Sequence, residues 1–303
     1  MQLPRYDNQV LLLDGGMGKE LMFRGVKVPE TIWSAGALMT DPEAVCQIHL
    51  DYISVGTDII TTNTYGVIRQ DLVKEGIEDR FADLNRIACQ LAVQAREASG
   101  QNVLIAGSLP PLRGSYRPDQ VGPIDEIEIL YREQAEILAP HVDLLLCETM
   151  SSAAEGRAAA TAACSTGKPV WVAWTLHEDR SGRLRSGESI YQAINALKSL
   201  PVSGYLVNCC APESITKVMP KLKASKVDWI GGYANTFAPI PEDWNLDGDK
   251  ETDGLLALRS DLDPDSYGAH ATNWLAAGAN VVGGCCGTRP THIAKIRALI
   301  DAD

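Results

Sequence analysis

The stretch DPEAVCQIHLDYISVGTDIITTN, residues 41–63, holds one helix signal followed at once by one strand signal. Asp41 is a typical N-cap, Pro42 suits the first helical turn, and Gly56 marks where the helix is expected to stop. The run that follows, TDIITTN, is apolar on successive residues, as in strands buried on both faces. The stretch therefore predicts a helix connected directly to a parallel strand.

This unit of helix and strand recurs along the chain. Further apolar runs of the same kind lie at 9–14, 102–108, 142–148, 169–175, 203–209, 227–235 and 279–285. Helical patterns separate them, and the clearest are at 124–142, 189–200, 212–225 and 290–300. Eight alternating units predict an α/β fold, a (β/α)8 TIM barrel that forms a single domain over residues 1–303. An open, doubly wound sheet is the alternative, but eight regular units at this length favour closure.

Composition limits the partners of the chain. It has 303 residues, 45% of them hydrophobic, and a formal net charge of -12. An acidic surface repels nucleic acid and anionic membranes, so we expect neither as a partner. No apolar run is long enough to span a bilayer, and residues 1–10 lack the apolar core of a secretory signal. We therefore expect a cytoplasmic protein, and a homo-oligomer is neither required nor excluded.

The segment 236–265 differs from the rest of the chain because it is acidic and rich in turn residues. It follows the seventh expected strand, so we interpret it as a long loop after that strand. A solvated insertion and a lid over the barrel are both compatible with this composition.

Polar and thiol groups end the otherwise apolar runs. A closed parallel barrel brings the C-terminal ends of its strands to one face, where active sites are built. The residues at these ends are Asp14 with Gly15 and Gly16, Asn63, Ser108, Glu148, Thr175, Asn208 with Cys209, Tyr233 to Asn235, and Cys285 with Cys286.

Three thiols are expected to converge at this face. Cys209 ends the sixth strand, and Cys285 and Cys286 end the eighth inside the motif GGCCGT. Adjacent cysteines rarely pair with each other, because the ring that they would close is strained. Zinc takes cysteine sulfur in a tetrahedron, and a catalytic zinc keeps one position open, whereas sulfur disfavours magnesium and calcium. The pattern predicts a Zn²⁺ site, and three buried thiols without a metal are the alternative.

Cys210 competes with Cys209 for the metal. Neighbouring strand residues point to opposite faces, so both should not face one ion. Cys209 is preferred because it follows the apolar run directly, next to Asn208. The remaining cysteines stand singly in apolar stretches and are expected to pack as small hydrophobes. They are Cys46, Cys89, Cys147 and Cys164.

Asp14 and Glu148 are the two carboxylates expected at the barrel mouth. Two acids beside a zinc ion would suit an ammonium group, although a salt bridge or a helix cap is an alternative role for each. The motif DGGMGKEL (14–21) lacks the spacing of phosphate-binding loops, so we interpret it as a tight turn where a small ligand touches the backbone. Single histidines show no ligand spacing and receive no role; they are His49, His141, His177, His270 and His292.

Together these motifs resemble the homocysteine S-methyltransferases, a zinc-dependent barrel family that includes the S-methylmethionine and betaine enzymes. The resemblance runs nearly end to end. The motif GGCCGTRPTHI with its upstream Asn-Cys is specific to the family, whereas the other short motifs are not. The matching stretches are LLLDGGMGKEL (11–21), IWSAGAL (32–38), HLDYISVGTDIITTNTY (49–65), LLLCETM (144–150), VNCC (207–210) and GGCCGTRPTHI (283–293).

The resemblance implies roles for the residues at the mouth. In the family, zinc is held by the Asn-Cys cysteine and the Cys-Cys pair, which correspond to the three cysteines above, and no catalytic residue beyond this metal site is implied. The amino-acid part of homocysteine is held by the turn after the first strand and the acid after the fourth, which correspond to Asp14, Gly15 and Glu148. Trp33 and Tyr65 fall where the family places aromatic side chains near the substrate.

The implied reaction is methyl transfer to the homocysteine thiolate at zinc, which forms methionine. A sulfonium or ammonium donor of the S-methylmethionine, S-adenosylmethionine or betaine type would be a small cation, which suits an aromatic mouth. Trp174 and Tyr233 could also face such a donor, although packing is the preferred interpretation for both.

Two segments that we expect to be loops do not match the family pattern, so the resemblance does not identify the methyl donor. GSLPPLRGSYRPD (107–119) and the acidic segment 236–265 depart from the family pattern where a donor would approach. An acceptor such as selenohomocysteine and a donor such as dimethylsulfoniopropionate stay as alternatives. A barrel that only holds zinc or thiols is a third, but it would not need the carboxylates of Asp14 and Glu148.

Overall fold

The computed structural model describes Leu3 and residues 9–302, so most of the segment expected to lack a signal lies outside the described residues. Eight parallel strands form one sheet in the order β1-β8-β7-β6-β5-β4-β3-β2, which places nearly all sequence neighbours side by side. The strands are β1 (Leu11–Leu12), β2 (Ile59–Thr61), β3 (Leu104–Leu109), β4 (Leu144–Met150), β5 (Val170–Trp174), β6 (Gly204–Asn208), β7 (Trp229–Ala234) and β8 (Val281–Gly284).

The sheet closes on itself between β1 and β2. Leu13 forms a parallel bridge with Ile59. Main-chain hydrogen bonds flank this bridge, from Asp58 N to Leu12 O at 2.8 Å and from Asp14 N to Ile59 O at 3.0 Å. The predicted single-domain (β/α)8 barrel is therefore confirmed, and the open sheet is wrong.

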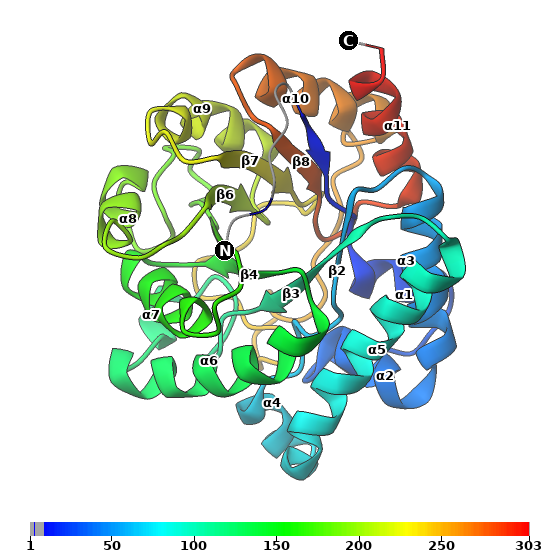
Figure 1. Ribbon diagram of the computed structural model, residues 1–303. Coiled ribbons are helices and arrows are strands. Elements are labelled where there is room, and N and C mark those ends of the chain that lie inside the picture. Colours follow the sequence, from blue (N-terminus) through cyan, green and yellow to red (C-terminus); the bar gives the residue numbers. More distant parts are fainter. Residues whose placement is uncertain (1–2, 4–8, 303) are drawn as a thin grey trace.

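Helices surround the barrel (Figure 1). They are α1 (Met17–Phe23), α2 (Ala37–Thr40), α3 (Pro42–Ser54), α4 (Arg69–Lys74), α5 (Phe81–Ser99), α6 (Ile124–Leu138), α7 (Ala153–Cys164), α8 (Ile190–Ala196), α9 (Pro212–Lys223), α10 (Pro264–Ala276) and α11 (Pro290–Ile300), with 3-10 turns at Trp33–Gly36, Glu78–Arg80, Pro118–Gln120 and Ala139–His141. No helix in the described part of the chain is long and apolar enough to cross a membrane.

The unit at 41–63 forms as its sequence predicts. The Asp41 carboxylate accepts a hydrogen bond from Ala44 N at 3.1 Å and so caps α3. The helix ends at Ser54, and Gly56 follows with a φ of +93° before β2 begins.

Apolar side chains fill the barrel interior up to the level where the site begins. Leu13, Leu144 and Leu146 pack there with Trp171 and Trp229, whose ring centroids lie 5.7 Å apart. A second, larger apolar layer lies between the sheet and the helices. The barrel is thus a packed core rather than a pore, and a ligand can enter only at its polar end.

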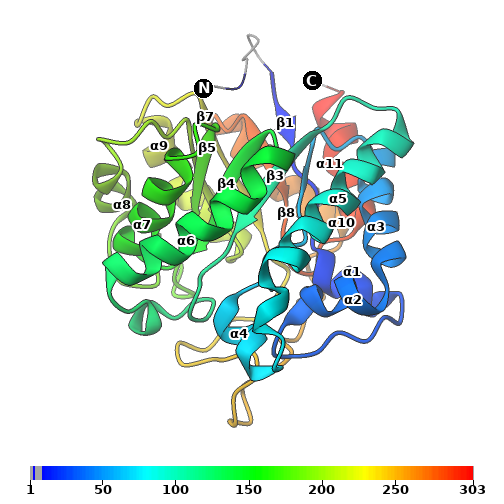
Figure 2. The same cartoon turned by 60° about the horizontal axis from the view of Figure 1, so that its bottom comes forward.

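The acidic segment is a loop that lies at the end of the barrel near α4 (Figure 2). Its residues 236–263 form no helix or extended strand, and their isolated bridge joins Phe237 to Leu258. The predicted loop at 236–265 is two residues too long, because Asp263 caps α10 by accepting from Ser266 N at 2.8 Å. We call residues 236–263 the mouth segment.

Candidate active site

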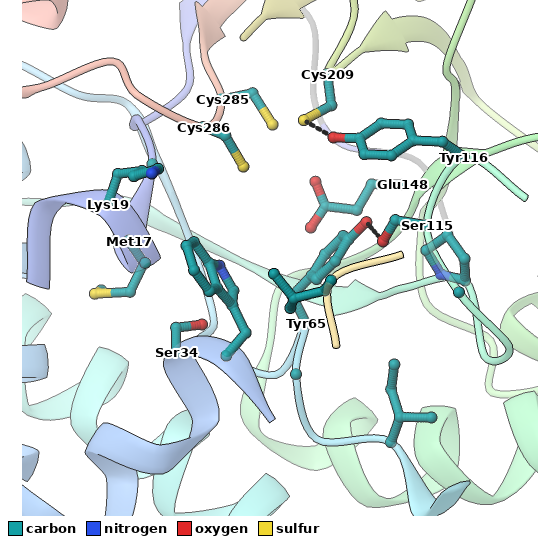
Figure 3. A pocket seen from close by; sticks show the side chains of 18 of the residues that line it. Met17, Lys19, Ser34, Tyr65, Ser115, Tyr116, Glu148, Cys209, Cys285 and Cys286 are labelled. Atoms are coloured by element: carbon teal, nitrogen blue, oxygen red, sulfur yellow. Dashed lines mark hydrogen bonds between the residues drawn. The ribbon is translucent and has the colours of Figure 1, made fainter. Parts of the chain in front are cut away.

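The three predicted thiols meet at the C-terminal end of the strands. The Sγ atoms of Cys209, Cys285 and Cys286 all lie within 4.8 Å of one another. Figure 3 shows the sulfurs facing a shared space, with the Glu148 carboxylate beside it. Within the described residues, no other group of at least three histidine, cysteine or acidic side chains gathers in this way.

The backbone conformation directs Cys209, and not Cys210, toward the other two thiols. Cys209 follows β6 with a φ of +47°, an uncommon conformation for a side chain other than glycine, and its N–H donates to Tyr233 O at 3.0 Å. Cys210 is fully buried in the layer between sheet and helices instead. Of the two neighbours, Cys209 therefore joins the thiol cluster and Cys210 does not.

Cys285 and Cys286 are held by the chain that leaves β7. Cys285 N donates to Ala234 O at 2.9 Å, and Cys286 O accepts from Thr236 N at 2.9 Å. Gly287, with a φ of +83°, then turns the backbone into the left-handed region. Strands β7 and β8 together thus fix the two adjacent sulfurs.

Hydrogen bonds among the three thiols shift their pKa values in opposite directions. Burial alone would raise the pKa of Cys209, but hydrogen bonds from Cys285, Cys286 and Tyr116 outweigh it and bring that pKa below its ordinary value. The same hydrogen bonds to Cys209 raise the pKa of Cys285 and of Cys286. The cluster by itself therefore favours one thiolate, and a divalent cation would be needed to stabilise three. Soft sulfur donors in this number fit a zinc ion.

Tyr116 is a contact that the sequence did not predict. Its hydroxyl lies 3.1 Å from the Cys209 sulfur, and its ring packs against Trp244 of the mouth segment with centroids 5.6 Å apart. Tyr116 has a φ of +66°, so the loop before α6 adopts an uncommon conformation there. The sequence shows that 107–119 departs from the family pattern, but nothing in it indicates a contact with sulfur.

Asp14 is a buried carboxylate without a cation. It is 6% exposed and accepts from Thr61 N at 2.7 Å and from Thr61 Oγ1 at 3.0 Å. Burial raises its pKa to about 8, in spite of these hydrogen bonds, and the nearby charge of Glu148 raises it further. No ion pair involves it within the described residues, and Gly16, not Asp14, occupies the N-cap of α1. Neither alternative role, salt bridge or cap, applies.

Glu148, which lies in β4 two residues before the strand ends, is a second buried carboxylate that lines the cavity. It accepts hydrogen bonds from Ser108 Oγ and, at 3.1 Å, from Tyr233 OH. Burial raises its pKa to about 7, and the negative charge on Cys209 contributes. It has no ion pair among the described residues, and Ser152 caps the following helix α7. Two buried carboxylates thus face the cavity, and no side chain in the described part of the chain forms an ion pair with either.

The remaining predicted residues line the same cavity. A Cβ on Gly15 would lie 2.7 Å from both Tyr52 OH and Thr288 Oγ1, so only glycine lets the chain run this close. Tyr65 OH lies 2.7 Å from Ser115 Oγ. One cavity of about 220 Å³ is lined by all eight predicted residues, namely Asp14, Gly15, Trp33, Tyr65, Glu148, Cys209, Cys285 and Cys286.

Trp174 and Tyr233, for which packing is the preferred interpretation from sequence, lie in different surroundings. Trp174 is fully buried in the layer between sheet and helices, so packing is its role. Tyr233 lines the cavity and donates to Glu148, which makes it part of the site rather than rim packing alone.

A protein-family model described as homocysteine S-methyltransferase matches residues 11–300. The chain belongs to the homocysteine S-methyltransferase family. A homocysteine S-methyltransferase from Escherichia coli K12 is 29% identical over 308 residues, which cover 95% of this chain and 94% of the relative. A selenocysteine methyltransferase from Astragalus bisulcatus is 28% identical, over 96% of this chain and 92% of the relative.

Solved structures agree with this assignment to the homocysteine S-methyltransferases. The metallated form of the homocysteine methyltransferase MmuM from Escherichia coli superposes with a TM-score of 0.80 at 29% identity, over 97% of each chain. The protein is thus an enzyme of this family, with a three-cysteine cluster that can bind a metal.

Proposed function

We propose that this enzyme is a zinc-dependent homocysteine S-methyltransferase, which moves a methyl group from a sulfonium or ammonium donor to homocysteine and so forms methionine. The observation that carries the proposal is the placement of three thiols and two unpaired buried carboxylates around one cavity. The metallated form of the Escherichia coli relative supports a metal at the thiols.

Cys209, Cys285 and Cys286 would hold the zinc. When bound, zinc offers an open position to the acceptor sulfur and lowers the pKa of its thiol, which is otherwise about 8.5. The thiol proton goes to solvent, so the chain does not have to supply a general base.

Asp14 and Glu148 would orient the acceptor. An ammonium group between them replaces the missing cation and favours the ionised form of both carboxylates. Hydrogen bonds from Thr61, Ser108 and Tyr233 hold the carboxylates in place before the substrate arrives. The amino acid is therefore fixed at its ammonium end, while its sulfur points toward the cysteines.

Trp33 and Tyr65 would receive the methyl donor from the mouth side. Their aromatic faces attract a cation with about 0.5–2 kcal/mol per contact. In the reaction, the acceptor sulfur forms a bond to the methyl carbon, and the bond from that carbon to the donor's sulfur or nitrogen breaks. The electron pair of the broken bond stays on the donor, which leaves without its positive charge.

The test is turnover of homocysteine by zinc-loaded protein, with methionine followed by mass. S-methylmethionine, S-adenosylmethionine, betaine and dimethylsulfoniopropionate are offered separately, and selenohomocysteine replaces homocysteine in a parallel series. Methionine from at least one donor is expected. No methionine from any donor, with one zinc per chain confirmed, would contradict the proposal.

The two carboxylates predict a pH dependence of amino-acid binding. Their pKa values of about 8 for Asp14 and about 7 for Glu148 are raised, so both carry protons in the empty, metal-free site at pH 6. Ammonium binding requires the charged forms, so the affinity should increase as pH rises from 6 to 8. We expect an increase of about tenfold or more for methionine, which lacks a thiol proton.

Calorimetry on reduced, metal-free protein measures this dependence. The same series on Asp14→Asn should show a weaker increase, because only one of the two carboxylates then loses a proton. An affinity for methionine that is constant or falls from pH 6 to 8 would show that these carboxylates do not bind the ammonium group.

A further inference from the structure

Lys19 is a buried cation that the proposed reaction does not use. It lies on α1, is only 9% exposed and lines the cavity. Figure 3 shows it on the α1 side of the cavity, across from Tyr116. Its ammonium donates one hydrogen bond, to Leu256 O at 3.2 Å, and lies 5.8 Å from the ring centroid of Phe237.

No carboxylate neutralises this lysine within the described residues. Its hydrogen bond goes to a carbonyl group, so two of its three N–H donors have no acceptor among the residues that the structure describes. A buried charge is costly unless it is paired. Burial lowers the pKa of Lys19, and a charge on Cys286 opposes this effect. An anionic group of a bound ligand could therefore pair with the Lys19 ammonium group.

The position of Lys19 separates it from the proposed ammonium site. Asp14 and Glu148 accept hydrogen bonds from residues of strands β2, β3 and β7, at the floor of the cavity. Lys19 is hydrogen-bonded to the mouth segment. Apolar side chains fill the barrel below the site, so a second substrate must enter from the side where the mouth segment lies. The cavity thus has an acidic floor and a basic group at its entrance.

We propose that the Lys19 ammonium binds a carboxylate of the methyl donor, so that the enzyme selects zwitterionic donors over donors with the same onium group and no carboxylate. The proposal rests on the proposed function. The aromatic side chains of Trp33 and Tyr65 line the same cavity and would take the onium end, while Lys19 takes the anionic end. Lys19 would then be a specificity-determining residue.

The test compares Lys19→Met and Lys19→Arg with the unaltered enzyme and with Lys198→Met, which changes an exposed lysine after α8. Betaine, dimethylsulfoniopropionate and S-methylmethionine are each offered beside their primary amides. For a carboxylate donor that is turned over, Lys19→Met should raise the donor KM by about 10- to 100-fold, the usual size of a lost charged hydrogen bond. The amide should be unaffected, and Lys19→Arg should recover part of the loss.

A binding measurement without turnover distinguishes a failure of this inference from a failure of the proposed function. Calorimetry with 4-methylpentanoate and 4-methylpentanamide, uncharged at the onium position, should show carboxylate binding to zinc-loaded enzyme that Lys19→Met abolishes and Lys198→Met retains. If homocysteine is not methylated at all, the proposed function fails, and this measurement still decides the role of Lys19.

Three results would overturn the inference. The first is equal carboxylate binding by the enzyme and Lys19→Met, or no binding by either. The second is an equal loss of turnover with carboxylate and amide donors together with a lower zinc content, which would mean that Lys19 only balances the charge of the thiolates. The third is a raised KM for homocysteine with every donor, which would place the acceptor's carboxylate at Lys19.

Discussion

Cys209→Ala is expected to abolish both zinc binding and methyl transfer, whereas Cys210→Ala, one residue away, retains both. The Cys209 sulfur lies within 4.8 Å of those of Cys285 and Cys286, while Cys210 packs in the layer between sheet and helices. Loss of a group that only supports a metal ligand costs about 10- to 100-fold, so loss of the ligand itself should cost on the order of 1,000-fold or more in activity.

Metal analysis and turnover are measured on both variants after the same zinc loading. Cys210→Ala is the matched control because it also removes one thiol group, from the neighbouring residue. We expect this change to lower only the stability of the protein. Unfolding by denaturant should show that Cys209→Ala is still folded, so that its lost metal reflects a lost ligand. One zinc per chain in Cys209→Ala, or a loss of zinc in Cys210→Ala, would show that Cys209 is the wrong choice of metal ligand.

The fold and the floor of the site follow from local patterns. Each strand is a short apolar run, and the parallel barrel brings the last polar residue of each run to one face. For this reason the sequence alone predicts that Asp14, Glu148 and Cys209 lie together. Alternation of side chains along a strand excludes a shared role for Cys209 and Cys210, and the choice of Cys209 rests on its place directly after the apolar run, next to Asn208.

Contacts made through loops could not be predicted in the same way. Tyr116 reaches the Cys209 sulfur from a loop with a positive φ, and Lys19, although it lies on α1, donates its hydrogen bond to Leu256 O of the mouth segment. Such contacts depend on how two distant loops pack, and no periodic pattern records that packing. The sequence of the mouth segment indicates turns and acidity, and its position beside Lys19 and Tyr116 is evident only in three dimensions.

Glu148→Gln should weaken homocysteine binding strongly and leave the zinc in place. The substitution keeps the size of the side chain and one acceptor oxygen, so one of the hydroxyls of Ser108 and Tyr233 can still donate to it, while the other can accept from the amide NH2 group. It removes the charge that would pair with the ammonium group, and the loss of a charged hydrogen bond in a buried site should lower kcat/KM for homocysteine by about 100-fold. Most of the loss should be in KM, because the ammonium is bound equally before and during the transfer.

Glu155→Gln is the matched control for this change. Glu155 is also buried and its pKa is also raised to about 7 by burial, but it accepts from Ser151 at the start of α7 and does not line the cavity. Its substitution should leave the KM for homocysteine unchanged. Zinc content, KM for homocysteine and KM for the donor are measured on both variants. An unchanged homocysteine KM in Glu148→Gln would reject the ammonium site, and equal losses in the two variants would trace the effect to the loss of a buried carboxylate in general, because only one of these two glutamates faces the substrate.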